Sequence, residues 1–134
     1  MSLLVTIRKD LGSFRLKVSF ETQEGVPGLL GASGCGKSMT LRCIAGIVRP
    51  DEGRIVLNGR TLFDSRARID LPPQRRRVGF LFQHYALFPH MTAGQNILSG
   101  MDRRMDKAAR QARLEEVLER FRLTGLEGRR PGQL

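Results

Sequence analysis

The chain has 134 residues, which is enough for one domain and too few to promise two. Hydrophobic residues make up 40% of the sequence and charged residues 27%, values that exclude disordered and fibrous proteins. No apolar run reaches the roughly 18 residues that span a bilayer, the first residues lack the apolar core of a signal peptide, and two cysteines are too few for a disulfide framework. These features lead us to expect a cytoplasmic protein.

A formal net charge of +10 favours an anionic partner, which on charge alone could be a nucleotide, a nucleic acid or an anionic lipid surface. The basic residues gather in short clusters. Such clusters are most often solvated surface in loops or on helix faces, and we predict this for each of them. They lie at residues 66–68, 75–77, 103–110 and 129–130.

The start of the chain predicts three strands. Residues 3–7 alternate weakly and residues 14–20 alternate cleanly between apolar and polar side chains, which is the period of half-buried strands, and the two would fit as an antiparallel pair. A short apolar run at residues 26–30 then leads directly into Gly31. Pro27 confines the pairing part of this third strand to its end or to a sheet edge.

A helix and a hairpin are predicted next. Residues 37–47 have the spacing of a nearly buried helix, which Gly46 and then Pro50 should stop. Asn58 and Gly59, between apolar segments at 54–57 and 60–63, are the strongest short hairpin signal. Residues 64–74 read as a polar connecting segment. The continuous apolar run at 78–82 predicts a strand buried on both faces.

The last part of the chain predicts helices. Thr92 is placed to cap a short helical turn, and residues 106–123 read as an amphipathic helix. The tail at 125–134 is loop-like. The apolar stripe of the long helix consists of Leu114, Val117, Leu118 and Phe121.

Residues 31–38 match the phosphate-loop pattern, in which two glycines lie five apart and the second precedes Lys and Ser. Gly34 and Gly36 allow backbone conformations that let successive amides point at phosphate oxygens, and the following helix adds the positive end of its dipole. Lys37 supplies a point charge for the β- and γ-phosphates, and the Ser38 hydroxyl is placed to ligate Mg²⁺. The residues expected to bind ATP are Gly31, Ser33, Gly34, Cys35, Gly36, Lys37, Ser38 and Met39.

Four further segments are similar to the ATP-binding subunits of ATP-binding-cassette importers. They read LRCIAG at 41–46, PDEGRIVLNG at 50–59, RRVGFLFQ at 76–83 and LFPH at 87–90. The resemblance implies an α/β fold: a P-loop NTPase core with an N-terminal antiparallel β portion and the start of a helical subdomain. It implies one incomplete cassette domain, with core and β portion at 1–83 and the Q-loop and helical subdomain at 84–134.

Within that family the chain most resembles the molybdate importers, through NGRTLFDS at 58–65 and LPPQRRR at 71–77. Related oxyanion, iron and sugar importers share much of this pattern. The resemblance implies that the full-length parent hydrolyses ATP as a homodimer to drive solute import, with molybdate or a related oxyanion as the solute. Two alternatives are a cassette ATPase that acts on nucleic acid and a non-catalytic nucleotide-binding fragment.

The resemblance also assigns roles to the segment at 83–91. Gln83 would reach the Mg²⁺ and the attacking water, which makes Lys37 and Gln83 the catalytic residues and Ser38 and Gln83 the metal residues; otherwise Gln83 is a polar strand-end residue. The segment from Gln83 to Met91 would receive an integral-membrane permease subunit, which argues against a nucleic-acid partner. This implies a peripheral position on the inner face of the cell membrane.

Several positions limit the match. Leu11 stands where such importers carry the aromatic residue that stacks on adenine, and Phe14 is close by. His84 and His90 read as loop residues and do not match the family's switch histidine. The chain reaches Leu134 without a signature sequence, Walker B Asp, catalytic Glu or switch His, so we expect the chain alone to be inactive as an ATPase.

Overall fold

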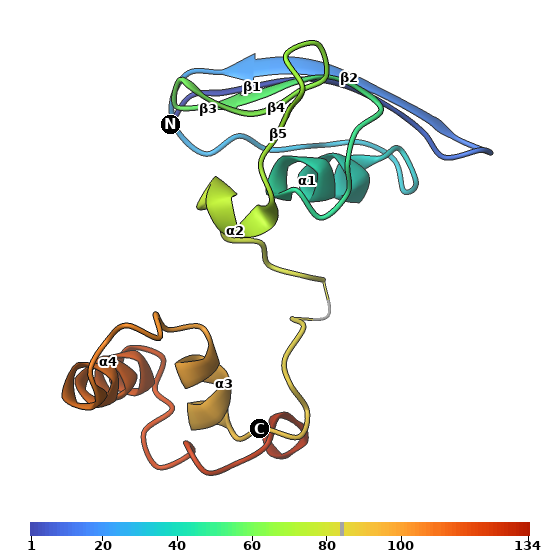
Figure 1. The fold of residues 1–134 in the computed structure, drawn as a ribbon. Helices are drawn as coiled ribbons and strands as arrows, with labels where there is room; N and C mark the ends of the chain where they lie inside the picture. Colours follow the sequence, from blue (N-terminus) through green and yellow to red (C-terminus); the bar gives the residue numbers. More distant parts are fainter. Residues whose placement is uncertain (84) are drawn as a thin grey trace. The chain divides into compact units, whose positions relative to one another are not determined.

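A computed structural model describes residues 1–83 and 85–134, so that His84, expected in a loop, lies outside the described residues. The chain divides into two compact units, Met1–Phe80 and Leu81–Leu134, which can be followed in Figure 1 by the colours that mark residue number. The division falls slightly before the subdomain boundary predicted after Gln83.

The first unit is built on an antiparallel sheet with strand order β2-β1-β3-β4-β5 (Figure 1). The strands are β1 (Leu3–Asp10), β2 (Arg15–Thr22), β3 (Glu52–Leu57), β4 (Arg60–Asp64) and β5 (Ile69–Asp70). The first two strands pair antiparallel over their full length, from Leu3 opposite Thr22 to Asp10 opposite Arg15, as their alternation predicted.

The predicted hairpin at residues 54–63 is confirmed. Leu57 pairs with Arg60, and the two residues between them have φ values of 48° at Asn58 and 76° at Gly59. Two successive positive φ values are typical of the type I′ turn, which matches the right-handed twist of the flanking strands. The Asn58 side chain also accepts a hydrogen bond from the amide of Ser2 at 2.9 Å, so this turn is tied to the start of β1.

The core of this unit lies between the sheet and helix α1 (Lys37–Ala45), which runs along one face of the sheet (Figure 1). Val5 and Ile55 are fully buried on the sheet side, and Cys43 is fully buried on the helix side. The helix ends at Gly46, as predicted. It is not nearly buried throughout, because only one face meets the sheet and Leu41 remains 45% exposed.

Two predicted strands are absent. Residues 26–30 and 78–82 carry no strand in the described structure, and Val26, Leu30 and Leu81 are 99%, 98% and 78% exposed. A continuous apolar run is typical of a central parallel strand, which needs a neighbour on each edge. The described strands all pair antiparallel with one another, and neither of these two segments pairs with any of them.

The segment at 64–74, predicted as a polar connecting segment, contains regular secondary structure. It contains β5, which pairs with β4, and it leads into the short helix α2 (Pro73–Arg76). Pro73 at the first helical turn suits this start, because proline lacks only an amide that would have no partner there. Arg75 and Arg76 therefore lie in a helix, and Arg77 is its C-cap residue.

The second unit consists of helices α3 (Ala93–Ser99) and α4 (Lys107–Arg120) and a short 3-10 helix, η1 (Pro131–Gln133). Thr92 caps α3 as predicted, with its hydroxyl accepting from the Gln95 amide and the Gln95 side chain accepting from the Thr92 amide. Leu114 and Leu118 are buried on α4. Phe121 does not join their stripe: it follows the last helical residue and is 66% exposed.

The tail of the second unit returns to the start of α3. The amide of Ala93 donates to the carbonyl of Arg129 at 2.7 Å, and the amide of Gly94 donates to that of Glu127 at 2.9 Å. These bonds satisfy helix-end amides that have no partner within α3. None of the helices in the described part of the chain combines the length and the apolar character needed to cross a bilayer.

Candidate phosphate-binding site

The glycines of the loop at 31–38 take conformations that other residues avoid. Gly34 has φ 81°, and Gly36, the N-cap of α1, has φ 97° and ψ 6° in the left-handed region. A Cβ would strain both positions. The first amides of α1 have no acceptor within the helix, so the loop presents donors and the positive helix end at one place, as an anion requires.

Close packing is a second reason for glycine, and the sequence did not reveal it. A methyl group at Gly36 would overlap the Cδ1 of Leu16 and lie 3.4 Å from the Cε1 of Phe14. A methyl group at Gly31 would lie 2.7 Å from the Sγ of Cys35. The loop therefore packs against the start of β2 at Gly36 and against its own Cys35 side chain at Gly31.

The ammonium group of Lys37 folds back over this loop. Its Nζ donates to the carbonyl oxygens of Gly31 at 2.7 Å and Ala32 at 2.8 Å, and it lies 3.5 Å from the Sγ of Cys35. An ammonium has three donors, and these contacts direct all of them at the loop. The arrangement holds a positive charge at the loop, which fits a phosphate ligand.

The residues after Lys37 differ in what they can offer. Ser38 is exposed in the first turn of α1, so its hydroxyl is available to a ligand or a metal. Met39 is half-buried and packs against the core, which leaves only its amide for phosphate. Thr40 is buried and its hydroxyl donates to the carbonyl of Gly36 at 3.0 Å, closing the first turn.

The donor set fits Mg²⁺ in the manner usual at nucleotide sites. Among the described residues, no three His, Cys, Asp or Glu side chains gather in a metal-binding arrangement. Mg²⁺ is commonly held by one or two protein oxygens together with substrate phosphates and waters, and it seldom needs a full protein cage. An exposed Ser38 beside a phosphate-binding loop satisfies that requirement.

Gln83 belongs to the second unit. It is exposed in a turn in which the amide of Tyr85 donates to the carbonyl of Phe82 at 2.9 Å. The strand that was expected to end at Gln83 is absent, so the side chain is positioned by the turn. Its action on Mg²⁺ and on the attacking water remains a prediction.

The apolar residues that follow Gln83 are exposed, and their backbone is held by one side chain. Tyr85, Leu87 and Phe88 are 69%, 52% and 47% exposed. Asn96 of α3 accepts from the amide of Phe88 at 2.9 Å and donates to the carbonyls of Phe88 at 3.1 Å and Met91 at 3.2 Å. Asn96 therefore holds the backbone at Phe88 and Met91, while the neighbouring apolar side chains remain exposed.

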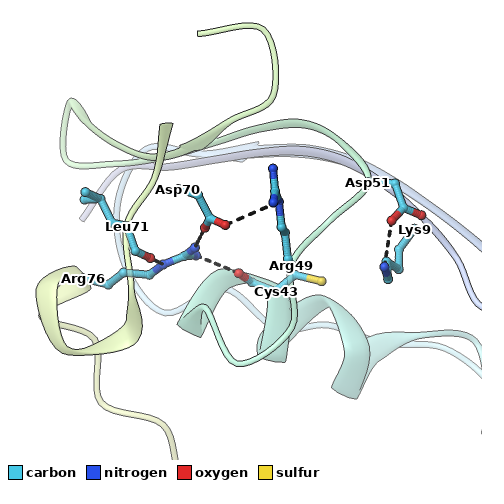
Figure 2. Close-up of polar contacts among 7 residues, drawn as sticks. All are labelled: Lys9, Cys43, Arg49, Asp51, Asp70, Leu71 and Arg76. Carbon is cyan, nitrogen blue, oxygen red and sulfur yellow. Dashed lines mark hydrogen bonds and ion pairs between the residues drawn. The ribbon is translucent and has the colours of Figure 1, made fainter. Parts of the chain in front are cut away.

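Asp51, directly before β3, is bonded to the end of β1. Its carboxylate accepts from Lys9 Nζ at 2.7 Å and from the amide of Asp10 at 2.7 Å, and Figure 2 draws the contact with Lys9. These hydrogen bonds lower the pKa of Asp51, since they favour its charged form. The contact ties the residue before β3 to the hairpin that carries Leu11 and Phe14, which are 39% and 38% exposed.

One prediction about the basic clusters is wrong, because Arg76 is not on a solvated surface. It is 2% exposed, and its guanidinium reaches the carbonyls at the end of α1 together with Asp70 and Leu71 (Figure 2). Burial lowers the pKa of Arg76, and the neighbouring Asp70 opposes that change. The sequence carries no signal that distinguishes Arg76 from its neighbours Arg75 and Arg77.

The chain is similar in sequence to ATP-binding proteins of solute import. The family described as ABC transporter matches residues 15–134. The molybdenum import ATP-binding protein ModC of Paramagnetospirillum magneticum is 43% identical over 96% of this chain and 35% of its own length. The sulfate/thiosulfate import ATP-binding protein CysA of Gloeobacter violaceus is 46% identical over 100% of this chain and 39% of its own length.

A third relative and a solved structure are also similar to this chain. The molybdate/tungstate import ATP-binding protein WtpC of Archaeoglobus fulgidus is 42% identical over 100% of this chain and 53% of its own length. The chain thus spans about a third to a half of these curated relatives. A dimeric ATP-binding cassette in a post-hydrolysis state with ADP and Pi has a TM-score of 0.71, with 25% identity, covering 100% of this chain and 63% of the other. The predicted cassette fold is confirmed.

Proposed function

The chain belongs to the ABC transporter family, and on that basis we propose that it binds the phosphates of ATP at residues 31–38. The observation that carries the proposal is the position of the Lys37 ammonium, 2.7 Å from the Gly31 carbonyl and 2.8 Å from the Ala32 carbonyl. A phosphate entering the loop offers Lys37 charged oxygens in place of neutral carbonyls, which makes stronger hydrogen bonds.

Each residue of the loop has a role in this proposal. The amides of Gly34 and Gly36 would donate to phosphate oxygens, and those of Ser38 and Met39 would add the positive end of α1. The Cys35 amide, which donates to the Ala32 carbonyl at 3.3 Å, would exchange that carbonyl for a phosphate oxygen. The Ser38 hydroxyl would hold Mg²⁺, which would supply charge neutralisation at the phosphates. Gly31 and Ser33 would shape the entry to the loop, and Gln83 would orient the attacking water.

In the full-length parent, we propose ATP hydrolysis by a homodimer that drives solute import. The relatives include molybdenum, molybdate/tungstate and sulfate/thiosulfate import proteins of similar identity to this chain. Molybdate or a related oxyanion is therefore the proposed solute. A dimeric solved neighbour with ADP and Pi supports assembly in pairs.

The permease contact is proposed at residues 83–91. Partly exposed Tyr85, Leu87 and Phe88 form an apolar surface of the kind that receives the apolar face of a partner helix. The hydrogen bonds from Asn96 tie the Phe88 backbone to α3, while the Phe88 side chain remains 47% exposed. Binding there would hold the protein peripherally on the inner face of the membrane.

Titration calorimetry with ATP and Mg²⁺ tests the proposed site. Lys37→Ala should weaken binding by about tenfold or more, since charge-assisted hydrogen bonds contribute roughly 1.5–3 kcal/mol. Lys17→Ala is the matched control, because it removes an exposed lysine from β2 of the same unit. Equal affinities for wild type and Lys37→Ala would remove the phosphate role from Lys37.

A further inference from the structure

The end of α1 that lies away from the phosphate loop is held by a buried side chain. A helix leaves its last four carbonyls without donors from within the helix. The amide of Gly46 reaches the carbonyls of Arg42 and Cys43. One terminal nitrogen of Arg76 donates to the carbonyls of Cys43 at 2.8 Å and Ile44 at 2.9 Å. Arg76 therefore satisfies a carbonyl one position beyond those that Gly46 reaches.

The rest of the guanidinium is fixed from the opposite side. The Nε of Arg76 donates to the carbonyl of Leu71 at 2.7 Å, and its second terminal nitrogen pairs with Asp70 at 3.0 Å (Figure 2). Asp70 also lies 3.5 Å from the Nε of the exposed Arg49. A planar donor group with partners along both edges has one orientation, so Arg76 joins α1 rigidly to β5 and the start of α2.

The helix end is shaped to admit this side chain. A methyl group at Gly46 would lie 2.5 Å from the Nε and 2.8 Å from the Cζ of Arg76. The C-cap glycine therefore provides the left-handed turn, at φ 81°, and also the space for the guanidinium. The Arg76 side chain is 1% exposed, whereas Arg75 and Arg77 on either side are exposed.

The position of α1 depends on such contacts. With nine residues it is about 13 Å long at 1.5 Å per residue, and isolated helices shorter than about 12 residues are marginal in water. Its N-terminal amides form part of the phosphate loop, so the direction of its axis sets where they point. A cation at its C-terminal end also interacts favourably with the negative end of the helix dipole.

We propose that Arg76 is a positioning residue for the phosphate loop, holding the C-terminal end of α1 so that the amides beyond Gly36 converge on phosphate. The inference rests on the proposed function. Arg76 acts through the helix and contacts no ligand. Asp70 and Leu71 orient its guanidinium, which makes the segment at 70–76 part of the nucleotide site although it lies far from the loop in sequence.

Affinity for MgADP, measured by titration calorimetry on the full chain well below the melting temperature, tests this proposal. Arg76→Gln should weaken MgADP binding by at least about fivefold, the lower end of couplings between linked sites, while adenosine binding is unchanged. The MgADP affinity of Arg76→Lys, which keeps the charge without the planar guanidinium, should lie between those of wild type and Arg76→Gln. Asp70→Asn should weaken MgADP binding less than Arg76→Gln does. Arg75→Gln removes an exposed charge from the same short helix and should bind as wild type does.

The outcomes separate the two proposals. A wild-type chain that fails to bind MgADP makes both the proposed function and this inference wrong. Wild-type binding with an equal affinity in folded Arg76→Gln makes only the inference wrong, because a residue that merely stabilises the fold changes the melting temperature without changing the affinity of the folded state. If Arg76→Gln does not fold, the comparison is made with Arg76→Lys and Asp70→Asn.

A measurement on the wild-type chain needs no substitution. Coupling between sites is reciprocal, so MgADP must stabilise the contacts of Arg76 if those contacts favour MgADP. In NMR spectra the Arg76 Nε proton should exchange with solvent several-fold more slowly when MgADP is added, and that of Arg75 should not. An unchanged Arg76 exchange rate at saturating MgADP would overturn the proposal.

Discussion

Leu16 of β2 packs into the space that a side chain at Gly36 would occupy. Leu16 is 2% exposed and belongs to the core under the sheet, while Gly36 is the residue at which the phosphate loop becomes α1. The core and the candidate site therefore meet at the contact between Leu16 and Gly36. A substitution at either residue should alter both the packing of the core and the conformation of the phosphate loop.

Gly36→Ala should lower both stability and nucleotide affinity. The new Cβ would overlap Leu16, and φ 97° is strained for any residue with a side chain, at a cost of roughly 1–3 kcal/mol. Thermal unfolding and MgATP titration measure the two effects. Gly128→Ala, where a Cβ meets open space, should change neither. A normal melting temperature in Gly36→Ala would contradict the packing argument.

The two cysteines should react very differently with iodoacetamide at neutral pH. Cys35 is exposed in the loop, whereas Cys43 is fully buried and its pKa is raised by that burial, with Lys9 and Arg76 opposing the change. The thiolate is the reactive form, so Cys43 should be modified only after unfolding. Mass spectrometry should show one adduct, at Cys35, which MgATP slows. Rapid labelling of Cys43 in the folded chain would show that α1 opens readily.

Asp51 should make the stability of the first unit depend on pH. Its pKa lies below the ordinary value of 3.8, chiefly because of the hydrogen bond from Lys9, so its contribution is present above that value and is lost as the pH falls through the lower folded-state pKa. The stability difference between wild type and Asp51→Asn, from urea unfolding, should therefore shrink between about pH 5 and pH 2. In a Lys9→Gln background the shrinkage should be much smaller. A difference that does not vary with pH would contradict this assignment.

The apolar loop should matter for coupling and not for nucleotide binding. In the complete transporter, the double variant Tyr85→Ala with Phe88→Ala should separate ATP hydrolysis from transport or weaken assembly with the permease, because it removes the apolar anchors. Asn96→Ala should act in the same direction by releasing the loop backbone. Phe121→Ala removes an exposed aromatic elsewhere in this unit and is the control. Normal transport and assembly in the double variant would defeat the proposed docking role.

The sequence alone determined the features that depend on a few neighbouring residues. Asn58 and Gly59 specified their turn, Thr92 with Gln95 specified the start of α3, and the glycines at 34 and 36 specified the bend of the loop. In each case the preferred φ and ψ values or a hydrogen bond a few residues away decides the conformation, so the information is local. The alternation in β1 and β2 is likewise a local record of one buried face.

Tertiary structure alone decided the features that depend on distant residues. The apolar runs at 26–30 and 78–82 resemble strands, yet a strand exists only where a neighbouring edge accepts its hydrogen bonds. Arg76 looks like one of three equivalent surface arginines until α1 brings the carbonyls of Cys43 and Ile44 to it. The close approach of Leu16 to Gly36 is likewise invisible in the sequence, because burial and contact are set by how elements far apart in the chain pack together.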